Sequence, residues 1–448
     1  MRIAVIGSGI AGLGSAWLLS RQHDVTLFEA NDRLGGHTHT HAIELGGRAF
    51  AVDSGFIVYN PRHYPLLTRL FVELGVASQP TTMSFAVRNE GSGLEYNATS
   101  LDKLFCQRRN LLSPRFLGMV CDILRFYREA PGLLGIEGTG PTLDDWLREH
   151  RYGAAFRDEH LVPMASALWS SPAEDILRFP APYLARFMAN HHMLQVRGRP
   201  EWRTVRGGSQ RYIDALHARW PVRERLACPV QAISRDAGGV RVTSAAGTEH
   251  YDHAVLACHS DQTLALLADA DPRERAILGA IRYQPNDTVL HTDARLLPRQ
   301  RKAWAAWNAL IPARSGEACG ITYCMNLLQS LDAPEPLCVS LNSTPRIDPA
   351  KILRRMQYHH PLYSHAMVAA QARKSEIQGR RRTWFAGAYW GFGFHEDGLR
   401  SAVEVADALG VRWPASTVVP LHVAGAEHAQ HDARDVRDAT IAATGLRR

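Results

Sequence analysis

The spacing of residues near the start of the chain indicates where cofactor chemistry could take place. Gly7-Ser8-Gly9-Ile10-Ala11-Gly12 has the pattern G-x-G-x-x-G, and Glu29 follows 22 residues after Gly7. The first glycine permits a tight turn, the second lets the backbone approach a pyrophosphate, and the third lets helix and strand pack closely. Glu29 would accept hydrogen bonds from the hydroxyls of an adenosine ribose. An acid there disfavours a 2′-phosphate and hence NADP, so NAD and FAD remain.

This motif needs a strand before it and a helix after it. Residues 2–6 are a short apolar run typical of a buried parallel strand. Residues 16–19 are predicted to be helical, and residues 25–28 form a second strand that ends at Glu29. A helix that begins after the glycines presents unpaired N–H groups and its positive dipole end to phosphates. The order of elements therefore predicts a dinucleotide-binding unit.

A second glycine pair favours FAD over NAD. Arg33-Leu34-Gly35-Gly36-His37 follows Glu29 closely, and Asp53-Ser54-Gly55-Phe56 comes after a predicted hairpin over residues 43–50. A double glycine would let backbone amides approach more of a long, extended cofactor. NAD-binding domains do not need this contact, whereas FAD-binding proteins do.

With these motifs the sequence resembles the flavin-containing amine oxidase superfamily, which includes amine oxidases, phytoene-type desaturases, protoporphyrinogen oxidase and fatty acid isomerases. More narrowly, it is similar to bacterial predicted NAD/FAD-binding proteins whose genes often neighbour cyclopropane-fatty-acid synthases. The segments that carry this narrower resemblance extend along nearly the whole chain: 53–60, 190–194, 199–205, 207–209, 291–293, 307–308 and 393–401.

The resemblance implies an α/β fold, in which a Rossmann-type FAD-binding domain is interleaved with a substrate domain of α+β character. The FAD-binding domain is expected over residues 1–60, 205–280 and 378–448, and the substrate domain over 61–204 and 281–377. Besides the first glycine motif, the residues implied to contact FAD are Glu29, Ala30, Arg33, Gly35, Gly36, His37, Gly55, Phe56, Ile57, Val230, Gly387, Ala388, Gly398 and Leu399.

Predicted elements in the middle and at the end of the chain agree with an interrupted cofactor domain. The pattern predicts strands over residues 229–233, 239–243, 253–258 and 383–388. Gly398 is expected to open a helix from Leu399 to Leu409, whose free amides would, by resemblance, face the pyrimidine edge of the flavin.

The sequence departs from the superfamily pattern at three points. The position after Ala386-Gly387 is usually acidic and binds the ribityl chain, but here it is Ala388. The pattern R-x-G-G-R ends in His37 instead of arginine, so the sequence does not say which phosphate or ring contact this residue makes. Amine oxidases commonly place a lysine near the flavin, whereas this chain has four lysines and none in a matching motif. The missing lysine argues against amine oxidation.

Candidate acids and bases lie between the last predicted strand and the last predicted helix. His395 and Glu396 are expected to handle protons beside the flavin, since a neutral imidazole can give or take a proton near pH 7. Tyr389 precedes them, and Tyr59 could line the opposite side of the pocket. The pairs His191-His192 and His359-His360 are ranked lower, and no histidine has a partner spacing that suggests a metal.

These features predict an FAD-dependent oxidoreductase that removes a hydride from an apolar substrate, most plausibly desaturating a lipid or fatty acyl chain. The aromatic stretch from Tyr389 to Phe394 could line an apolar tunnel. The alternatives are a redox-neutral fatty acid isomerase, an amine oxidase, and a flavin-binding subunit without turnover of its own.

Composition limits the partners and the compartment. The formal charge is +7, with 51 lysines and arginines against 44 acids, but no block of five like charges suggests nucleic acid. Seven cysteines without metal spacing predict a reducing, cytoplasmic location. An amphipathic helix that begins at Ser113-Pro114, with Phe116, Leu117, Val120, Leu124 and Tyr127 on one face, could touch anionic lipid. The sequence therefore also allows a peripheral location at the inner membrane.

Overall fold

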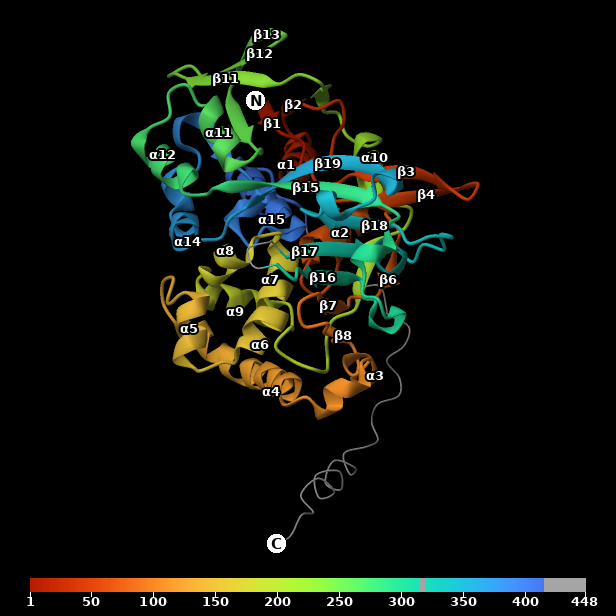
Figure 1. Ribbon diagram of the computed structural model, residues 1–448. Helices are drawn as coiled ribbons and strands as arrows, with labels where there is room; N and C mark the ends of the chain where they lie inside the picture. Colours follow the sequence, from red (N-terminus) through yellow and green to blue (C-terminus); the bar gives the residue numbers. More distant parts are fainter. Residues whose placement is uncertain (315–318, 415–448) are drawn as a thin grey trace, which may run out of the picture. The chain divides into compact units, whose positions relative to one another are not determined.

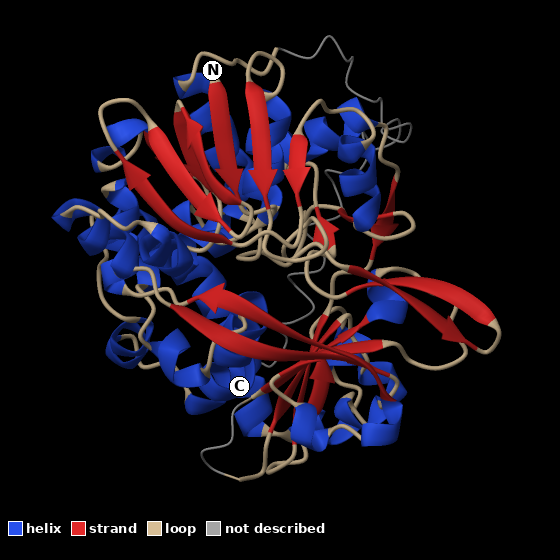
Figure 2. Cartoon of the chain, turned by 90° about the horizontal axis from the view of Figure 1, so that it is seen from above, coloured by secondary structure: helices blue, strands red, loops and turns tan. Residues whose placement is uncertain are grey.

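A parallel five-stranded sheet carries the predicted cofactor motif. The computed structural model describes residues 1–314 and 319–414, and residues 1–413 form one compact unit. The strand order is β10-β2-β1-β14-β20, and every neighbouring pair is parallel. Its strands are β1 (Arg2–Ile6), β2 (Asp24–Phe28), β10 (Arg223–Arg225), β14 (His253–Leu256) and β20 (Thr383–Phe385). The predicted α/β class is confirmed, and Figure 2 shows this sheet with its helices.

Helix α1 (Ile10–Leu19) begins directly after the glycine motif and packs against α15 (His395–Ala408). A Cβ on Gly12 would lie 1.8 Å from the carbonyl oxygen of Gly7, and one on Gly14 would lie 2.7 Å from Cδ1 of Leu399. Both approaches require glycine, because any side chain would push α1 away from its neighbours.

Two predicted boundaries near the end of the chain are wrong. The last strand ends at Phe385, and residues 388–390 form a 3₁₀ turn. Helix α15 begins at His395 and not at Leu399, because Asp397 accepts hydrogen bonds from the amides of Phe392 (3.0 Å) and Phe394 (3.1 Å) and so caps an earlier turn. Gly398 consequently lies inside the helix.

A seven-stranded mixed sheet forms the second layer (Figure 1), with the order β19-β15-β18-β17-β16-β7-β8. Its strands are β7 (Phe85–Asn89), β8 (Glu95–Asn97), β15 (Tyr283–His291), β16 (Trp307–Ile311), β17 (Gly320–Cys324), β18 (Cys338–Leu341) and β19 (Ile352–Pro361). All lie within 61–204 and 281–377, whereas the parallel sheet draws only on 1–60, 205–280 and 378–448. The domain boundaries stay a prediction, and the predicted part over 415–448 lies outside the described residues.

Three smaller sheets accompany these two in the described chain. They are the hairpin β3 (Thr40–Leu45) and β4 (Arg48–Asp53), the trio β5 (Val58–Tyr59), β6 (Ser78–Thr81) and β9 (Trp202–Val205), and the trio β11 (Val230–Arg235), β12 (Val240–Ser244) and β13 (Gly247–Tyr251). The hairpin over 43–50 and the strands at 229–233, 239–243 and 253–258 are thus confirmed to within a few residues.

Helices fill the rest of the described chain. They are α2 (Pro65–Leu74), α3 (Leu101–Leu104), α4 (Pro114–Glu129), α5 (Leu143–Glu149), α6 (Ala154–Phe156), α7 (Val162–Trp169), α8 (Ala173–Leu177), α9 (Ala181–Asn190), α10 (Gln210–His217), α11 (Ser260–Leu266), α12 (Pro272–Gly279), α13 (Met325–Leu328) and α14 (His365–Ala372). Within residues 1–314 and 319–414, none of them combines the length and the apolar character needed to cross a bilayer.

The predicted helix after Ser113 is α4, whose N-terminus is capped by the Ser113 hydroxyl. The five residues predicted to lie on one apolar face do not share one environment, however. The buried residues are Phe116, Met119, Ile123 and Phe126, whereas Leu117 and Leu124 are exposed. The helix is apolar on both sides, so periodicity alone could not tell which side meets the core.

The contact between Gly7 and Gly12 predicts a stability effect. Gly12→Ala should lower the free energy of unfolding by at least about 1–3 kcal/mol, because the new methyl group overlaps a backbone carbonyl. Thermal unfolding measures this change. Gly118→Ala in α4, where a Cβ meets nothing within 4 Å, is the matched control and should be neutral or stabilising. An unchanged melting temperature for Gly12→Ala would contradict the packing.

Candidate functional site

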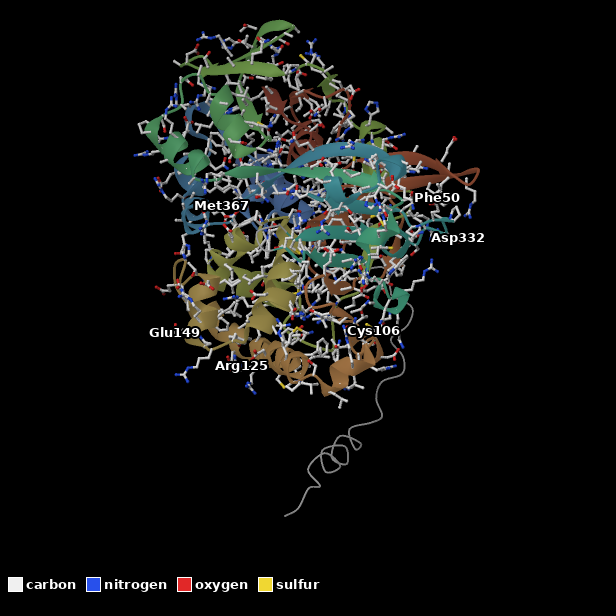
Figure 3. All side chains as sticks on the ribbon, in the orientation of Figure 1. Phe50, Cys106, Arg125, Glu149, Asp332 and Met367 are labelled. Atoms are coloured by element: carbon white, nitrogen blue, oxygen red, sulfur yellow. The ribbon has the colours of Figure 1, made fainter. Side chains whose placement is uncertain are left out.

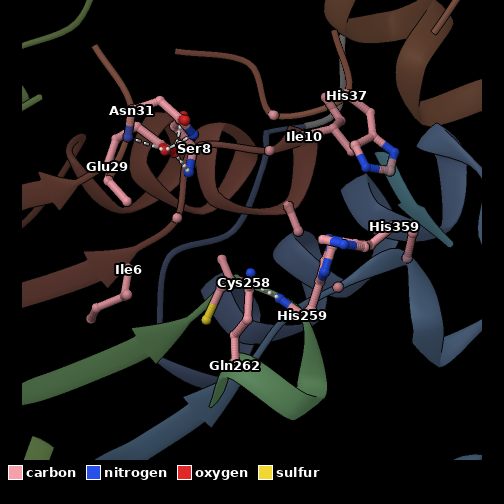
Figure 4. Close-up of a pocket in the computed structure, with 18 of the residues that line it drawn as sticks. Ile6, Ser8, Ile10, Glu29, Asn31, His37, Cys258, His259, Gln262 and His359 are labelled. Atoms are coloured by element: carbon pink, nitrogen blue, oxygen red, sulfur yellow. Dashed lines mark hydrogen bonds between the residues drawn. The ribbon is translucent and has the colours of Figure 1, made fainter. Parts of the chain in front are cut away.

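A cavity of about 620 Å³ lies at the carboxyl ends of the parallel strands, where open α/β sheets bind their ligands. Its lining combines the β1–α1 turn, the end of β2, the residues after β14, and the turn after β20 (Figure 4). Strand β19 contributes residues 357–361 from the second sheet. The predicted cofactor residues that line the cavity are Gly7, Ser8, Gly9, Ile10, Ala11, Glu29, Ala30, Arg33, Gly35, Gly36, His37, Val230, Gly387 and Ala388.

The glycine motif leaves room for a diphosphate beside the start of α1. A Cβ on Gly9 would meet nothing within 4 Å, although Gly9 lines the cavity. Helix α1 has no side-chain cap at its N-terminus, so its dipole end faces this space. Gly7 has a φ of +97°, which permits the turn that the sequence predicts. Backbone, dipole and empty space together fit an anionic dinucleotide linker.

Glu29 lies at the end of β2 and is already held on both carboxylate oxygens. Oε2 accepts hydrogen bonds from the Ser8 amide (2.9 Å) and the Ser8 hydroxyl (2.6 Å). Oε1 accepts from the Asn31 amide (2.9 Å) and the Asn31 side-chain nitrogen (2.7 Å). The hydroxyl and the side-chain amide can rotate away, so two acceptor positions on Glu29 can be given to ribose hydroxyls.

The second glycine motif forms a turn that is stabilised by hydrogen bonds among its own residues and with the first motif. Arg33 donates to the carbonyls of Thr38 (3.0 Å) and Gly36 (2.9 Å), and the Gly35 amide donates to the carbonyl of Ser8 (3.0 Å). Gly36 packs directly on Gly9, because a Cβ there would lie 3.0 Å from the Gly9 Cα atom. Arg33 thus shapes the cavity wall mainly by fixing this turn.

Six predicted cofactor residues do not line the cavity and support it from behind. Gly55 approaches the 35–37 turn so closely that a Cβ would lie 1.9 Å from the His37 carbonyl oxygen. Gly398 packs against Ile10 in the same way, at 2.7 Å. The complete set of such residues is Gly12, Gly55, Phe56, Ile57, Gly398 and Leu399.

His395 lines the cavity from the first turn of α15. Its ring stacks on Phe56, with ring centroids 3.7 Å apart, and its Nε2 atom is 3.0 Å from the Thr38 hydroxyl. Burial lowers the pKa of His395 from 6.5 to about 3. The ring therefore stays neutral at pH 7 and can exchange hydrogen bonds, but it cannot carry a stored positive charge there.

Glu396 and Tyr59 do not reach the cavity. Both oxygens of Glu396 accept hydrogen bonds from the first amides of α2, those of Leu66 and Leu67, each at 3.0 Å. Tyr59 is buried and donates to the Ser78 hydroxyl at 2.9 Å. Their positions are those of a helix cap and a strand contact, so the structure does not bring either of them together with His395 at the cavity surface.

Tyr389 does line the cavity, and its hydroxyl is buried without a hydrogen-bond partner by strict geometry. Burial raises the pKa of this phenol well above its usual value, so it is a donor and not an anion. Ala388 offers no polar side chain, and the Gly387 amide donates to the Ser401 hydroxyl at 2.8 Å. The Tyr389 hydroxyl atom is itself buried, so the structure does not present it to a ligand, although the residue contributes to the cavity wall.

Histidines gather in the cavity wall, where the sequence predicts His37 as a cofactor contact, ranks His359 and His360 lower, and does not single out His259. His37, His259, His359 and His360 all line the cavity, and the His37 ring lies 5.2 Å from His360 and 5.9 Å from His259 between centroids. His259 follows β14 directly, so the rule that ligands meet the ends of parallel strands could have found it. His359 and His360 come from β19 through long-range pairing, which no local pattern reveals.

The histidine group is not a metal site. Within residues 1–314 and 319–414 no cluster of three or more histidine, cysteine, aspartate or glutamate side chains could hold an ion. His191 and His192 lie elsewhere, beside His63, with centroids 5.3 and 5.2 Å from its ring.

The fold and the cavity define a dinucleotide-binding protein. The model of the family described as flavin containing amine oxidoreductase matches residues 10–290, and the chain belongs to that family. A flavin cofactor follows from this membership, and FAD is the form typical of the family.

A relative and two solved structures show how far the similarity extends. "Putative flavin-containing monoamine oxidase AofH" of Mycobacterium tuberculosis is 28% identical over 286 residues, which cover 60% of this chain and 59% of that protein. The match thus spans about three fifths of that relative. The CLA-producing fatty acid isomerase from P. acnes is 19% identical, with a TM-score of 0.65 over 91% of this chain and 98% of that one. Cyclohexylamine oxidase from Brevibacterium oxydans is 17% identical, with a TM-score of 0.64 over 91% and 99%. These structures show the same fold.

Gly9 provides a direct test of the cofactor path. Gly9→Leu should fold like the wild type but purify without the flavin absorbance near ~450 nm, because the side chain enters the space beside α1. Gly132→Leu, at another position where a Cβ meets nothing, should keep its flavin. If Gly9→Leu kept its full flavin content, the diphosphate could not lie at this turn.

The histidine group predicts a loss of stability on acidification. Burial, with smaller contributions from His259 and His359, lowers the pKa of His360 from 6.5 to about 4. Between these two values the unfolded chain binds a proton that the folded chain does not, so stability should fall as the pH drops from 6.5 toward 4. His360→Gln should reduce the fall in melting temperature between pH 7 and pH 5, whereas His250→Gln on exposed β13 should not. Equal pH profiles for both variants would contradict this account.

Proposed function

We propose that the chain is an FAD-dependent oxidoreductase that takes a hydride from an apolar substrate and introduces a double bond into a lipid or fatty acyl chain. FAD, when bound, supplies the two-electron acceptor. The observation that carries the proposal is the chemistry of the cavity wall: none of the four lysines of the chain lines it, and its one carboxylate, Glu29, lies at the dinucleotide end.

An aromatic cluster packs behind the cavity wall, and Phe394 is the member of it that lines the cavity. Phe394 lines the cavity and stacks on Phe187 of α9, with ring centroids 5.0 Å apart. Phe392 lies 4.9 Å from Tyr183, and Trp169 of α7 lies 4.7 Å from Phe187. The apolar ring of Phe394, held by these neighbours, supports an apolar substrate, because contact with it buries hydrocarbon area.

Two lysines that pair away from the cavity, and two histidines that line it, also support the proposal. Lys302 pairs with Asp102 (2.6 Å) at the surface, and Lys374 pairs with Glu404. In a desaturation one hydrogen leaves the substrate as a hydride and its neighbour leaves as a proton, which needs an acceptor. His360 and His395 are neutral at pH 7 and line this cavity, and the Nδ1 atom of His360 accepts a hydrogen bond from the Asn286 side-chain amide at 2.8 Å.

Anaerobic mixing of the flavin-loaded protein with fatty acids or phospholipids tests the proposal. Bleaching of the flavin together with a product lighter by two hydrogens is the expected result, since the substrate loses one hydride and one proton. An unchanged product mass would identify an isomerase instead. No flavin reduction by any lipid would leave the non-catalytic reading and refute desaturation.

Amine oxidation is the second candidate, favoured by the similarity to AofH. It requires flavin reduction by amines and release of peroxide in air. A screen of mono- and diamines under the same anaerobic conditions separates the two candidates, because a lipid desaturase should give no bleaching with any of them.

A further inference from the structure

Exposed leucines gather in one segment of the described chain. The described chain has ten exposed large apolar side chains, and six of them lie between residues 101 and 134. This segment forms α3, a 3₁₀ turn (Arg108–Leu112), α4 and a second 3₁₀ turn (Ala130–Gly135). They are Leu101, Leu111, Leu112, Leu117, Leu124 and Leu134. Single exposed leucines are ordinary, but six within 34 consecutive residues are a concentration of apolar surface that suggests a partner.

Helix α4 shows that this apolar surface is separate from the core. The inner side of α4 faces the core with four buried side chains, from Phe116 to Phe126. Leu117, Cys121 and Leu124 are spaced four and three residues apart, so they form a stripe on the outer side. Leu112, which is 88% exposed, lies just before this stripe. In Figures 1 and 3, α3, α4 and Arg125 lie at one end of the folded unit, far from β13.

The same segment carries a surplus of positive charge. Residues 101–134 contain six lysines and arginines and three acids, a net charge of +3 out of the +7 of the whole chain. The acids are neutralised locally: Asp102 pairs with Arg108 (2.7 Å) and Lys302 (2.6 Å), and Asp122 pairs with Arg125 (3.2 Å). Arg115 pairs with Glu159 outside the segment (2.7 Å), and Arg128 lies 3.8 Å from Glu129 with its side chain 77% exposed.

We propose that the outer face of residues 101–134 docks onto an anionic lipid bilayer. Leucines can enter the acyl boundary while the surrounding arginines and Lys103 bind headgroup phosphates. The exposed large apolar residues of this segment are all leucines, whereas protein interfaces are enriched in exposed aromatic anchors. The charge surplus selects an anionic surface over a neutral one. This proposal requires only the surface and does not depend on which reaction the flavin performs.

Vesicle flotation of the full-length, flavin-loaded protein tests the docking face. The wild type should float with phosphatidylglycerol vesicles and not with phosphatidylcholine vesicles, and salt should weaken the binding. The triple variant Leu112→Ser, Leu117→Ser, Leu124→Ser should bind at least about tenfold more weakly. The control Val196→Ser, Leu226→Ser removes exposed apolar side chains elsewhere and should bind like the wild type.

The charge contribution has its own matched pair. Arg108→Gln, Arg128→Gln should weaken binding to phosphatidylglycerol severalfold, because each cation near an anionic bilayer contributes favourably. Arg273→Gln, Arg275→Gln removes the same charge from exposed positions on α12 and should have little effect.

Cys121 provides a local probe of insertion. It is the one cysteine of the seven that is exposed, so an environment-sensitive thiol dye should label it preferentially. Its emission should shift to the blue with phosphatidylglycerol vesicles and stay unchanged with phosphatidylcholine vesicles. The same labelling of Cys121→Ser should lose this response.

Three outcomes would overturn the proposal. In the first, the folded, yellow wild type does not bind anionic vesicles. In the second, the triple leucine variant binds these vesicles as well as the wild type does. In the third, the wild type binds no vesicles but forms a dimer in solution, and the triple variant is a monomer. The last outcome would assign the face to a second copy of the chain. Flavin content and flavin reduction are measured separately, so failure here leaves the proposed reaction untouched.

Discussion

The contact between Gly12 and the Gly7 carbonyl constrains the rest of the cofactor layer. It sets how closely α1 can lie to the end of β1, and Gly14 and Gly398 then set how closely α15 can lie to α1. Because α15 starts at His395, this chain of glycine contacts fixes where the His395 ring meets the cavity. Residues nearly 400 positions apart in the sequence are thereby placed around one ligand.

The cavity wall is a composite of two kinds of surface. The side formed by the β1–α1 turn offers backbone amides, a helix dipole and Glu29, which suit a charged dinucleotide. The side formed by β19 and the turn after β20 offers neutral histidines and aromatic rings. A cofactor that is ionic at one end and flat and apolar at the other matches this division, and Phe394 on the apolar side stacks on the buried Phe187 of α9.

Local sequence signals predicted four of the five strands of the parallel sheet, because each of these four is a short apolar run, whereas the edge strand β10 was not predicted. The apolar run before Gly7 and the acid at Glu29 belong to one βαβ unit and can be recognised within about 30 residues. The start of α15 was missed because its cap is formed by Asp397 reaching back to Phe392 and Phe394. Glu396 was misplaced for a related reason: its partners are amides of α2, about 330 residues away. His360 entered the site only through pairing of β19 with β15, which depends on the whole mixed sheet.

The strand order of the parallel sheet also has a consequence for synthesis of the protein. β1 emerges first, but its neighbour β14 follows about 250 residues later, and β20, which completes that side of the sheet, comes after a further 125 or so. At roughly 5–20 residues per second, the ribosome needs on the order of 20–80 s to reach β20. During that interval the apolar edges of β1 and β14 are exposed to the cytosol or to chaperones. The nascent chain can close its cofactor pocket only after β20 and the turn that follows it have left the ribosome.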